Sequence, residues 1–384
     1  MSAARKLNAT PEAANDPAMP SPEELESLGA GTLPLFDIEN SPAARYMRAP
    51  PPERRWLFNG VLPLGIVGLI VAPGGTGKST FAIQMGVAVA TGGKLANAWD
   101  TGESGAALLL MAEDDDAELH RRVRMVAGHL GLTEKALRTL HTVSFVGEDV
   151  RLISETRERG IQHTDVVTRL IATAEKIPDL RLIVIDPASR WRDGDENDAG
   201  NATRFIQAVE RISKATGATV LLIHHTSKGA MASGESTQGA ARGSSALPDG
   251  SRWMAQLATV NKTMNKTLKL PEAEMRMHLV LSVPKGNYAP PQAEILLQRQ
   301  EGGYLKAVEA PRSLKDLGRN DEKIIALFKS EAAEGRTYST TRFIREYAGA
   351  TGPLELADHA LRERLRFLII EGKLKRGAKG VLTA

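Results

Sequence analysis

The segment Ala72-Pro73-Gly74-Gly75-Thr76-Gly77-Lys78-Ser79 constrains the fold of this chain more than any other stretch. The apolar run 65–71 precedes it, and residues 80–90 after it have the spacing of a helix. A buried strand, a glycine-rich loop and a helix start together form a cradle for phosphates. Glycines let backbone N–H groups turn inward, and the helix N-terminus adds partial positive charge. The pattern therefore predicts an α/β fold that binds and hydrolyses a nucleoside triphosphate.

The residues expected to contact ATP belong to this loop and the first helical turn. They are Pro73, Gly74, Gly75, Thr76, Gly77, Lys78, Ser79 and Thr80. Lys78 is expected to reach the β- and γ-phosphates and to act in catalysis, and the Ser79 hydroxyl to bind Mg²⁺. The usual pattern begins with Gly where this chain has Ala72, and a positive φ would be costly there. A glycine loop that arose by chance is the alternative, which the flanking strand and helix disfavour.

Short apolar runs alternate with helical segments along the next part of the chain. Strands are expected at 66–71, 106–111, 140–145, 182–185 and 219–223, and helices at 80–90, 115–130, 165–176 and 201–216. This alternation predicts parallel βαβ units, and the continuous apolar runs indicate helices on both faces of the sheet. Residues 250–260, 276–283 and 303–308 are expected to extend the sheet as antiparallel strands.

Two of the predicted strands end in carboxylates. Asp186 closes the run Arg181-Leu-Ile-Val-Ile-Asp and is expected to hold Mg²⁺ through water. Glu113 follows a second apolar run and is the candidate general base for the attacking water. Acidic residues also cap helices, so capping is the alternative for residues 113–116. We interpret Glu113 as catalytic and residues 114–116 as capping.

A third predicted strand ends in His224-His225, and His225 is the candidate sensor of the γ-phosphate. A structural histidine or a metal ligand is the alternative, although no further ligand cluster accompanies the pair. The Gly-, Ser- and Thr-rich residues that follow form a loop around Lys228. This loop either binds single-stranded nucleic acid through backbone amides and Lys228, or is an ordinary solvated loop.

Arg242 and Arg252 come after the last core strand, and both are candidate catalytic residues. An arginine supplied to a neighbouring subunit would stabilise charge at the γ-phosphate, although most arginines are simply solvated. Trp253 favours Arg252, because a packed indole would fix the segment.

Composition excludes several other classes of function. The chain has no Cys, which excludes disulfides, thiolate zinc sites and thiol nucleophiles and suits a reducing cytosol. Its net charge of +3 means that any nucleic-acid surface must be local. No apolar run reaches membrane-spanning length, and no apolar stretch follows Arg5 and Lys6 as in a secretory signal. We therefore expect a cytoplasmic protein without a membrane partner.

The chain divides by composition into four regions. Residues 1–44 are expected to be disordered or extended apart from a short helix near 22–28, residues 45–310 to form the ATPase domain, and the polar residues 311–320 to be a linker. Residues 321–384 contain predicted helices at 321–330, 340–347 and 355–371 and two short strands within 373–383. Three helices and a β-wing predict a small winged-helix domain.

The last helix and the wing of this domain are basic. They carry Arg362, Arg364, Arg366, Lys373, Lys375, Arg376 and Lys379. Such a cluster predicts that the helix enters the major groove of duplex DNA while the wing contacts the backbone. The candidate contacts are Arg362, Arg366, Lys373, Lys375 and Arg376. A protein-binding role or a solvated face is the alternative.

The motifs occur in an order that resembles the RepA-type plasmid replicative helicases. They are 72–79, Ala-Glu-Asp (112–114), Leu-Ile-Val-Ile-Asp-Pro (182–187), His-His-Thr-Ser-Lys-Gly (224–229), Arg-Gly-Ser-Ser (242–245), Arg-Trp (252–253) and Pro-Lys-Gly-Asn-Tyr (284–288). The resemblance covers roughly residues 45–310 and implies a RecA-like core, a hexameric homo-oligomer, ATP with Mg²⁺, and single-stranded DNA in the ring channel. It also implies the roles given above for Lys78, Ser79, Glu113, Asp186 and His225. Arg252 matches the family's trans arginine, Arg242 is a second candidate, and Lys285 matches a lysine near the nucleotide or the subunit interface.

Three functions remain open at this point. One is a ring motor that moves along or unwinds DNA, and another is a nucleotide-switched DNA-binding or loading factor. The third is a RecA-like repair ATPase that forms open filaments. Compact members of the family lack an extension such as 321–384. The same core occurs in many phage, plasmid and mobile-element proteins whose unwinding has not been shown, so the resemblance supports ATP hydrolysis more than unwinding.

Overall fold

The computed structural model describes residues 37–158, 160–195, 198–225, 246–268, 270–309, 313–349, 354, 356, 358–370, 373–377 and 381–383. The predictions for residues 1–36, Lys228 and Arg242 lie outside this set. The chain divides into two compact units, with the boundary between Glu53 and Arg54 rather than between residues 44 and 45. In the first unit, the one described helix is the 3₁₀ helix η1 (Ala43–Met47), which buries no residue.

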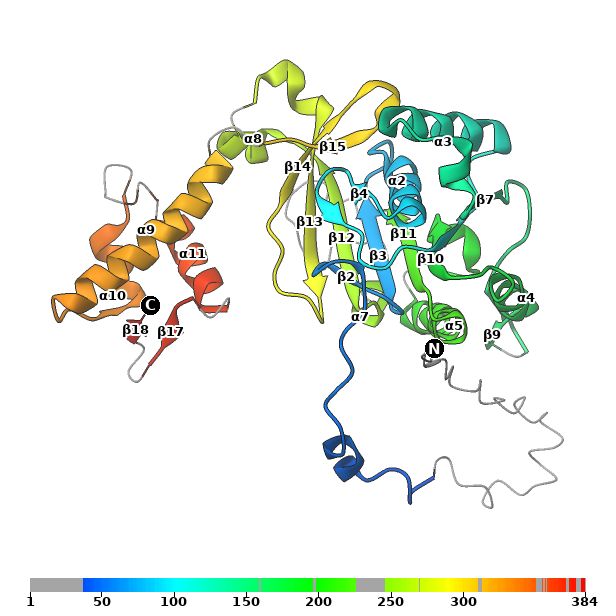
Figure 1. The fold of residues 1–384 in the computed structure, drawn as a ribbon, viewed down its shortest axis with the longest axis horizontal. Coiled ribbons are helices and arrows are strands. Elements are labelled where there is room, and N and C mark those ends of the chain that lie inside the picture. The colour runs from blue at the N-terminus through cyan, green and yellow to red at the C-terminus, as the bar shows by residue number, and fades with distance from the viewer. Residues whose placement is uncertain are drawn as a thin grey trace, which may run out of the picture. The chain divides into compact units, whose positions relative to one another are not determined.

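A nine-stranded sheet forms the centre of the second unit (Figure 1). Its strands are ordered β15 (Leu305–Ala307), β14 (Ile295–Arg299), β13 (His278–Gly286), β12 (Trp253–Thr259), β3 (Val67–Ala72), β11 (Thr219–His225), β10 (Leu180–Asp186), β6 (Ala106–Met111) and β7 (Leu140–Ser144). The strands from β12 to β7 are parallel to one another, while β13, β14 and β15 pair antiparallel. The mostly parallel α/β core predicted from the sequence is confirmed.

Two predictions for the sheet are corrected. Residues 250–260 were expected to form an antiparallel strand, but β12 is parallel to its neighbour β3. The long connection after β11 returns the chain to the starting edge of the sheet, as a parallel crossover requires. Strand β14 was not predicted, because its apolar part is only three residues, Ile295 to Leu297, before polar residues follow.

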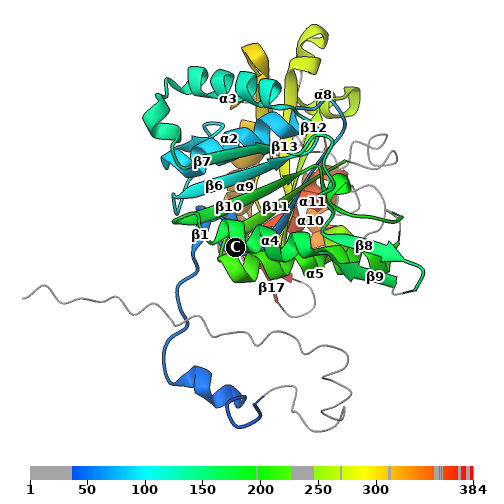
Figure 2. The ribbon, with the colours of Figure 1, turned by 90° about the vertical axis from the view of Figure 1, so that its right-hand side faces the viewer.

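Helices cover both faces of the sheet. Figure 2 shows α2 (Lys78–Thr91) and α3 (Asp116–Leu130) on one face, with α4 (Asp165–Ala174) and α5 (Ala199–Thr216) on the other. Successive strand residues alternate between two aliphatic cores: Leu109 packs beneath α2, and its neighbour Leu108 belongs to the core beneath α4 and α5. Each such leucine contributes roughly 1.5–3 kcal/mol on burial. The strands are continuously apolar because neither face meets water.

Smaller elements connect these layers. They are β1 (Trp56–Phe58), β2 (Leu62–Pro63), β4 (Lys94–Leu95), β5 (Trp99–Asp100), η2 (Glu134–Leu137), β8 (Ile153–Thr156), β9 (Gly160–His163), η3 (Ala188–Trp191), α7 (Ala246–Gly250), α8 (Lys262–Leu268), η5 (Glu272–Met277) and η6 (Glu301–Gly303). The antiparallel pair β8–β9, which the sequence analysis did not predict, lies between β7 and α4 along the chain.

The C-terminal residues have a hydrophobic core of their own. Its elements are α9 (Ser313–Ala333), β16 (Tyr338–Ser339), α10 (Thr340–Tyr347), α11 (Asp358–Ile370), β17 (Lys375–Arg376) and β18 (Val381–Thr383). The rings of Phe328 and Phe343 stack at 4.1 Å between centroids, and Tyr338 packs edge-on against Phe343. The three strands form a sheet in the order β16-β18-β17.

The predicted linker 311–320 is wrong from residue 313 onward, because α9 begins at Ser313. Leu314, Leu317 and Ile324 continue one helical spacing into the predicted linker, so its polar residues belong to a longer amphipathic helix. Across the described residues, no helix is long and apolar enough to cross a bilayer.

Candidate active site

The glycine-rich loop turns sharply between β3 and α2. Gly75 and Gly77 have φ values of 71° and 97°, which L-residues with side chains rarely adopt. Ala72 ends β3 without a positive φ and is fully buried, so the cost expected for its departure from the usual pattern does not arise. Helix α2 starts at Lys78, so its free N–H groups border the loop. This is the geometry of a phosphate cradle.

Lys78 and His225 are brought together at the mouth of the loop. The Lys78 Nζ donates to the Pro73 carbonyl at 3.0 Å and lies 3.3 Å from Nδ1 of His225. The contact follows from the parallel pairing of β11 with β3, in which His225 is the partner of Ala72. Lys78 is only 7% exposed, so its charge is poorly screened by water. A phosphate in the cradle would therefore meet a cation and an imidazole on the same side.

Asp186 lies at the carboxyl end of β10 and is 3% exposed. Burial raises its pKa to about 6; the Ser79 hydrogen bond and the charge of Lys78 oppose this, and the charge of Glu113 adds to it. Among the described residues, Oδ2 of Asp186 has no hydrogen-bond partner. A buried carboxylate oxygen without a partner, beside a hydroxyl, suits a hard divalent cation.

The donor set fits Mg²⁺ in particular. No group of three or more His, Cys, Asp or Glu side chains in the described chain could hold a metal without help. Mg²⁺ is usually held by one or two protein oxygens together with substrate phosphates and water. Ser79 and Asp186 are the residues that would hold it, and the bound ion would neutralise charge on the phosphates.

Glu113 begins the acidic run after β6. The neighbouring strands align it with Asp186, since Met111 pairs with Asp186 and the Ala112 N–H donates to the Asp186 carbonyl at 2.7 Å. The Glu113 side chain is exposed and has no hydrogen bond or ion pair within the described part of the chain, so it is free to turn toward a water. The arrangement is compatible with a general base.

The rest of the acidic run divides its roles. Asp115 caps α3, because its carboxylate accepts from the Glu118 N–H at 2.8 Å. Asp114 was expected to cap as well, but its Oδ2 lies 2.7 Å from Nη1 of Arg122, so it forms an ion pair along α3 instead. Burial raises the pKa of Asp114, and the charge of Arg122 opposes the shift.

Arg299 is a site residue that the sequence analysis missed. It ends β14, and its Nη2 donates to the Thr76 carbonyl in the phosphate loop at 3.0 Å. The adjoining strand is tied to the loop's helix, since Gln84 exchanges two hydrogen bonds with the Leu305 backbone at 2.8 and 3.0 Å. No local pattern identifies Arg299, because more than two hundred residues separate it from the loop.

Arg252 and Lys285 lie at the opposite edge of the sheet. The Arg252 N–H donates to the carbonyl of Val67, the first residue of β3, and its side chain is exposed. Trp253 is fully buried, as expected for a fixed segment. Lys285 Nζ donates to the Pro248 and Asp249 carbonyls at 2.7 and 3.0 Å. Within one chain these cations are therefore separated from the phosphate loop by the length of β3.

The candidate DNA contacts of the C-terminal elements are all at the surface. Arg362, Arg366, Lys373, Lys375 and Arg376 are exposed. Arg364, which the sequence analysis counted with this basic face, instead forms an ion pair with Asp321 on α9. The exposed cations thus come from one side of α11, from β17 and from the turn between them.

Residues 32–231 match the model of a protein family described as AAA domain. Among solved structures, the ATPase domain of another protein matches 64% of this chain and 85% of its own length, at 13% identity and a TM-score of 0.44. The crystal structure of the RadB recombinase matches 64% of this chain and 92% of its own length, at 18% identity and a TM-score of 0.39.

Proposed function

This chain belongs to the AAA domain family of P-loop ATPases, and we propose that it is a Mg²⁺-dependent ATPase that assembles head to tail into a ring and moves along single-stranded DNA. The observation that carries the proposal is the division of cations between two edges of one sheet. Lys78 lies at the edge with the phosphate loop, whereas the exposed Arg252 lies at the other. A neighbouring copy that presents its Arg252 to this loop would complete the site.

In this proposal, each residue has one task. The loop and Lys78 bind the phosphates, Ser79 and Asp186 hold Mg²⁺, and Glu113 takes the proton of the attacking water. His225, 3.3 Å from Lys78, changes partners when the γ-phosphate leaves. Because His225 is the last residue of β11, we expect that change to affect the residues that follow it, which include Lys228. A head-to-tail contact generates a closed ring if the rotation closes and an open filament if it does not. The mass of the assembly distinguishes the two.

The experiment is a comparison of hydrolysis with and without single-stranded DNA, together with the mass of the assembly. We expect single-stranded DNA to stimulate ATP hydrolysis. We also expect the protein to displace a strand from a forked duplex, and to form one closed species with a non-hydrolysable ATP analogue. Lys78→Ala is the matched control, since it should remove hydrolysis in both conditions. Assembly without unwinding would favour a nucleotide-switched loading factor, and open filaments of growing mass would favour a RecA-like repair ATPase.

The order of the C-terminal elements supports a second role, binding of duplex DNA by a winged helix. Helix, strand, two helices and a β-hairpin follow one another, and the exposed cations lie on α11 and the hairpin. In such a domain α11 enters the major groove and the hairpin follows the backbone. In this proposal, one chain carries both a duplex-binding surface and a strand-tracking motor.

Paired substitutions test this second role. Arg362→Gln with Arg366→Gln should weaken duplex binding and lower the slope of log affinity against log salt by about 2, one unit per lost phosphate contact. Lys329→Gln with Arg345→Gln removes the same charge from exposed positions on α9 and α10, and should leave the slope unchanged. Equal effects of the two pairs would leave only a general electrostatic attraction, and no effect of either would remove the DNA-binding role.

A further inference from the structure

A pocket of about 590 Å³ lies beside Glu113, on the side away from the phosphate loop. It is formed by the carboxyl ends of β6, β7 and β10, and its charged lining residues are Glu113, Glu148, Asp149, Arg151 and Arg190. The phosphate loop follows β3, which is three strands from β6 across the sheet, whereas β7 is the next strand on the other side. A carboxylate turned into this pocket is therefore turned away from the nucleotide.

Arg190 reaches the pocket on a rigid segment. The chain leaves β10 after Asp186 and passes over the end of β6, because Trp191 contacts residues that follow β7. The Trp191 ring is buried and packs edge-on against Phe145 at 5.3 Å, and its carbonyl accepts from the Leu152 N–H at 2.7 Å. The backbone at Arg190 is fixed by these contacts, while its guanidinium is exposed.

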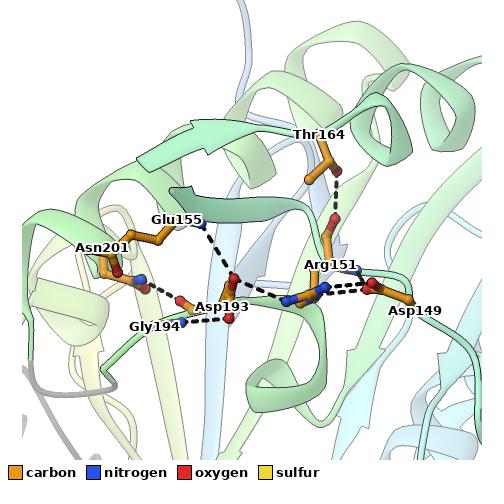
Figure 3. Close-up of polar contacts among 7 residues, drawn as sticks. All are labelled: Asp149, Arg151, Glu155, Thr164, Asp193, Gly194 and Asn201. Carbon is orange, nitrogen blue, oxygen red and sulfur yellow. Dashed lines mark hydrogen bonds and ion pairs between the residues drawn. The ribbon is translucent and has the colours of Figure 1, made fainter. Parts of the chain in front are cut away.

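The other arginine of the pocket is already engaged. Arg151 donates to both carboxylate oxygens of Asp149 at 2.8 and 2.6 Å and lies 3.0 Å from Oδ2 of Asp193 (Figure 3). Asp193 also accepts from the backbone N–H groups of Glu155 and Gly194, and the Arg151 carbonyl accepts from the Thr164 hydroxyl. This network holds Arg151 and Asp149 in place and removes both from further pairing.

Three charged side chains of the pocket stay unengaged. Within the described residues, Glu113, Glu148 and Arg190 make no side-chain hydrogen bond or ion pair. One guanidinium therefore shares the pocket with two unengaged carboxylates, only one of which belongs to the proposed catalytic set. A nucleic-acid phosphate is a poor third partner for Arg190, because three carboxylates line the same pocket.

We propose that Arg190 is a positioning residue that alternates between Glu113 and Glu148. Paired with Glu113, it holds the base on the β7 side of β6, and hydrolysis is slow. Paired with Glu148, it releases Glu113 to face the attacking water. A ligand that favours the second pairing stimulates hydrolysis in proportion to its differential affinity, and in the motor proposed above that ligand is single-stranded DNA. The inference rests on the proposed role of Glu113.

Two substitutions with opposite expected signs test it. Arg190→Ala should raise the kcat of hydrolysis without DNA by about two- to fivefold, the range for loss of one exposed ion pair. Glu148→Gln should lower it, because Arg190 then has only Glu113 to bind. Arg190→Lys, which keeps the charge and loses the bidentate fork, should fall between wild type and Arg190→Ala. The KM for ATP should stay unchanged in all three, since none touches the phosphate loop.

A merely structural role for the pocket would lower kcat in both variants, and that result would overturn the proposal. So would a fall in kcat for Arg190→Ala alone. A second measurement does not need hydrolysis: a double-mutant cycle on the denaturant unfolding of the nucleotide-free protein. Arg190→Ala and Glu113→Gln should be non-additive, while Arg190→Ala and Glu118→Gln should be additive, because Glu118 pairs with Arg121 and Arg122. Additivity in both cycles would reject the Arg190 pairing, whereas a wild type without hydrolysis would reject the proposed function.

Discussion

The two edges of the central sheet differ in what they offer a nucleotide. At the carboxyl edge, Lys78, His225 and Asp186 lie close together around a glycine-rich loop. At the amino edge, Arg252 and Lys285 lie beside the first residue of β3. Six residues of β3 separate the edges by roughly 17 Å, beyond the reach of an arginine side chain. In our proposal, one copy of the chain is sufficient to bind the nucleotide, whereas hydrolysis needs residues from two copies.

Removal of Arg252 tests the proposed division between two copies most directly. Arg252→Ala should keep nucleotide binding and lower kcat by about 10³–10⁵, the range for a trans arginine at a transferring phosphoryl group. Mixing Arg252→Ala with Lys78→Ala should restore part of the activity, because some interfaces then pair an intact loop with an intact arginine. Hydrolysis rates across mixing ratios check this.

Two other outcomes would contradict the division between copies. A mixture no more active than its components would place Arg252 outside the site. A kcat for Arg252→Ala that equals wild type would make it a solvated cation at the sheet edge. Lys306→Gln, which removes an exposed cation from β15, is the control for the loss of charge alone.

The second prediction concerns the base at the carboxyl edge. Glu113→Gln should lower kcat by about 10²–10⁴ while ATP binding is retained, because only proton abstraction is lost. Single-turnover hydrolysis and equilibrium binding of a fluorescent ATP analogue separate the two effects. Normal hydrolysis by Glu113→Gln would make Glu113 part of the helix-capping run with Asp115, and the base would lie elsewhere.

The carboxyl edge was largely predictable from the sequence, because its residues lie at or just beyond the ends of predicted strands. Asp186 and His225 each end an apolar run, Lys78 follows one after the glycine-rich loop, and parallel strands bring such ends to one edge. The same rule does not predict the direction of β12 relative to β3. The long connection after β11 decides whether these strands pair parallel or antiparallel. Local pattern therefore predicted that these residues lie near one another, and not the sheet's full topology.

What could not be predicted depends on contacts between distant segments. Arg299 reaches the Thr76 carbonyl from a strand that the sequence analysis missed. Asp114 pairs with Arg122 rather than capping α3, since the choice depends on which side chain lies within reach after folding. Arg364 likewise forms an ion pair with the buried Asp321 of α9 and does not join the exposed basic surface. In each case a charged side chain meets a partner that sequence spacing does not indicate.

The third prediction uses the near-complete burial of Asp186. A carboxyl whose pKa rises from its ordinary value to about 6 binds more protons in the folded than in the unfolded state between those values. The free energy of unfolding should therefore fall as pH rises through about 4 to 6, by roughly 3 kcal/mol at most. Asp186→Asn should lack this loss. Its free energy of unfolding minus that of wild type should therefore increase as pH rises over the same range, as measured by denaturant titrations of the nucleotide-free protein. A constant difference between the two proteins would show that Asp186 is solvated and not the buried ligand proposed for Mg²⁺.

A smaller effect is expected at Arg299, which ends β14 at the carboxyl edge of the sheet. Arg299 donates to the Thr76 carbonyl of the phosphate loop from the same chain, so we expect it to affect nucleotide binding rather than turnover. Arg299→Gln should raise the KM for ATP by about tenfold, the loss of one charge-assisted hydrogen bond, and leave kcat nearly unchanged. Arg299→Lys should recover part of the loss, while Lys306→Gln on the adjoining strand should show none. An Arg299→Gln variant that lost kcat in the manner of Arg252→Ala, and was rescued by mixing, would instead place a second arginine in the shared interface.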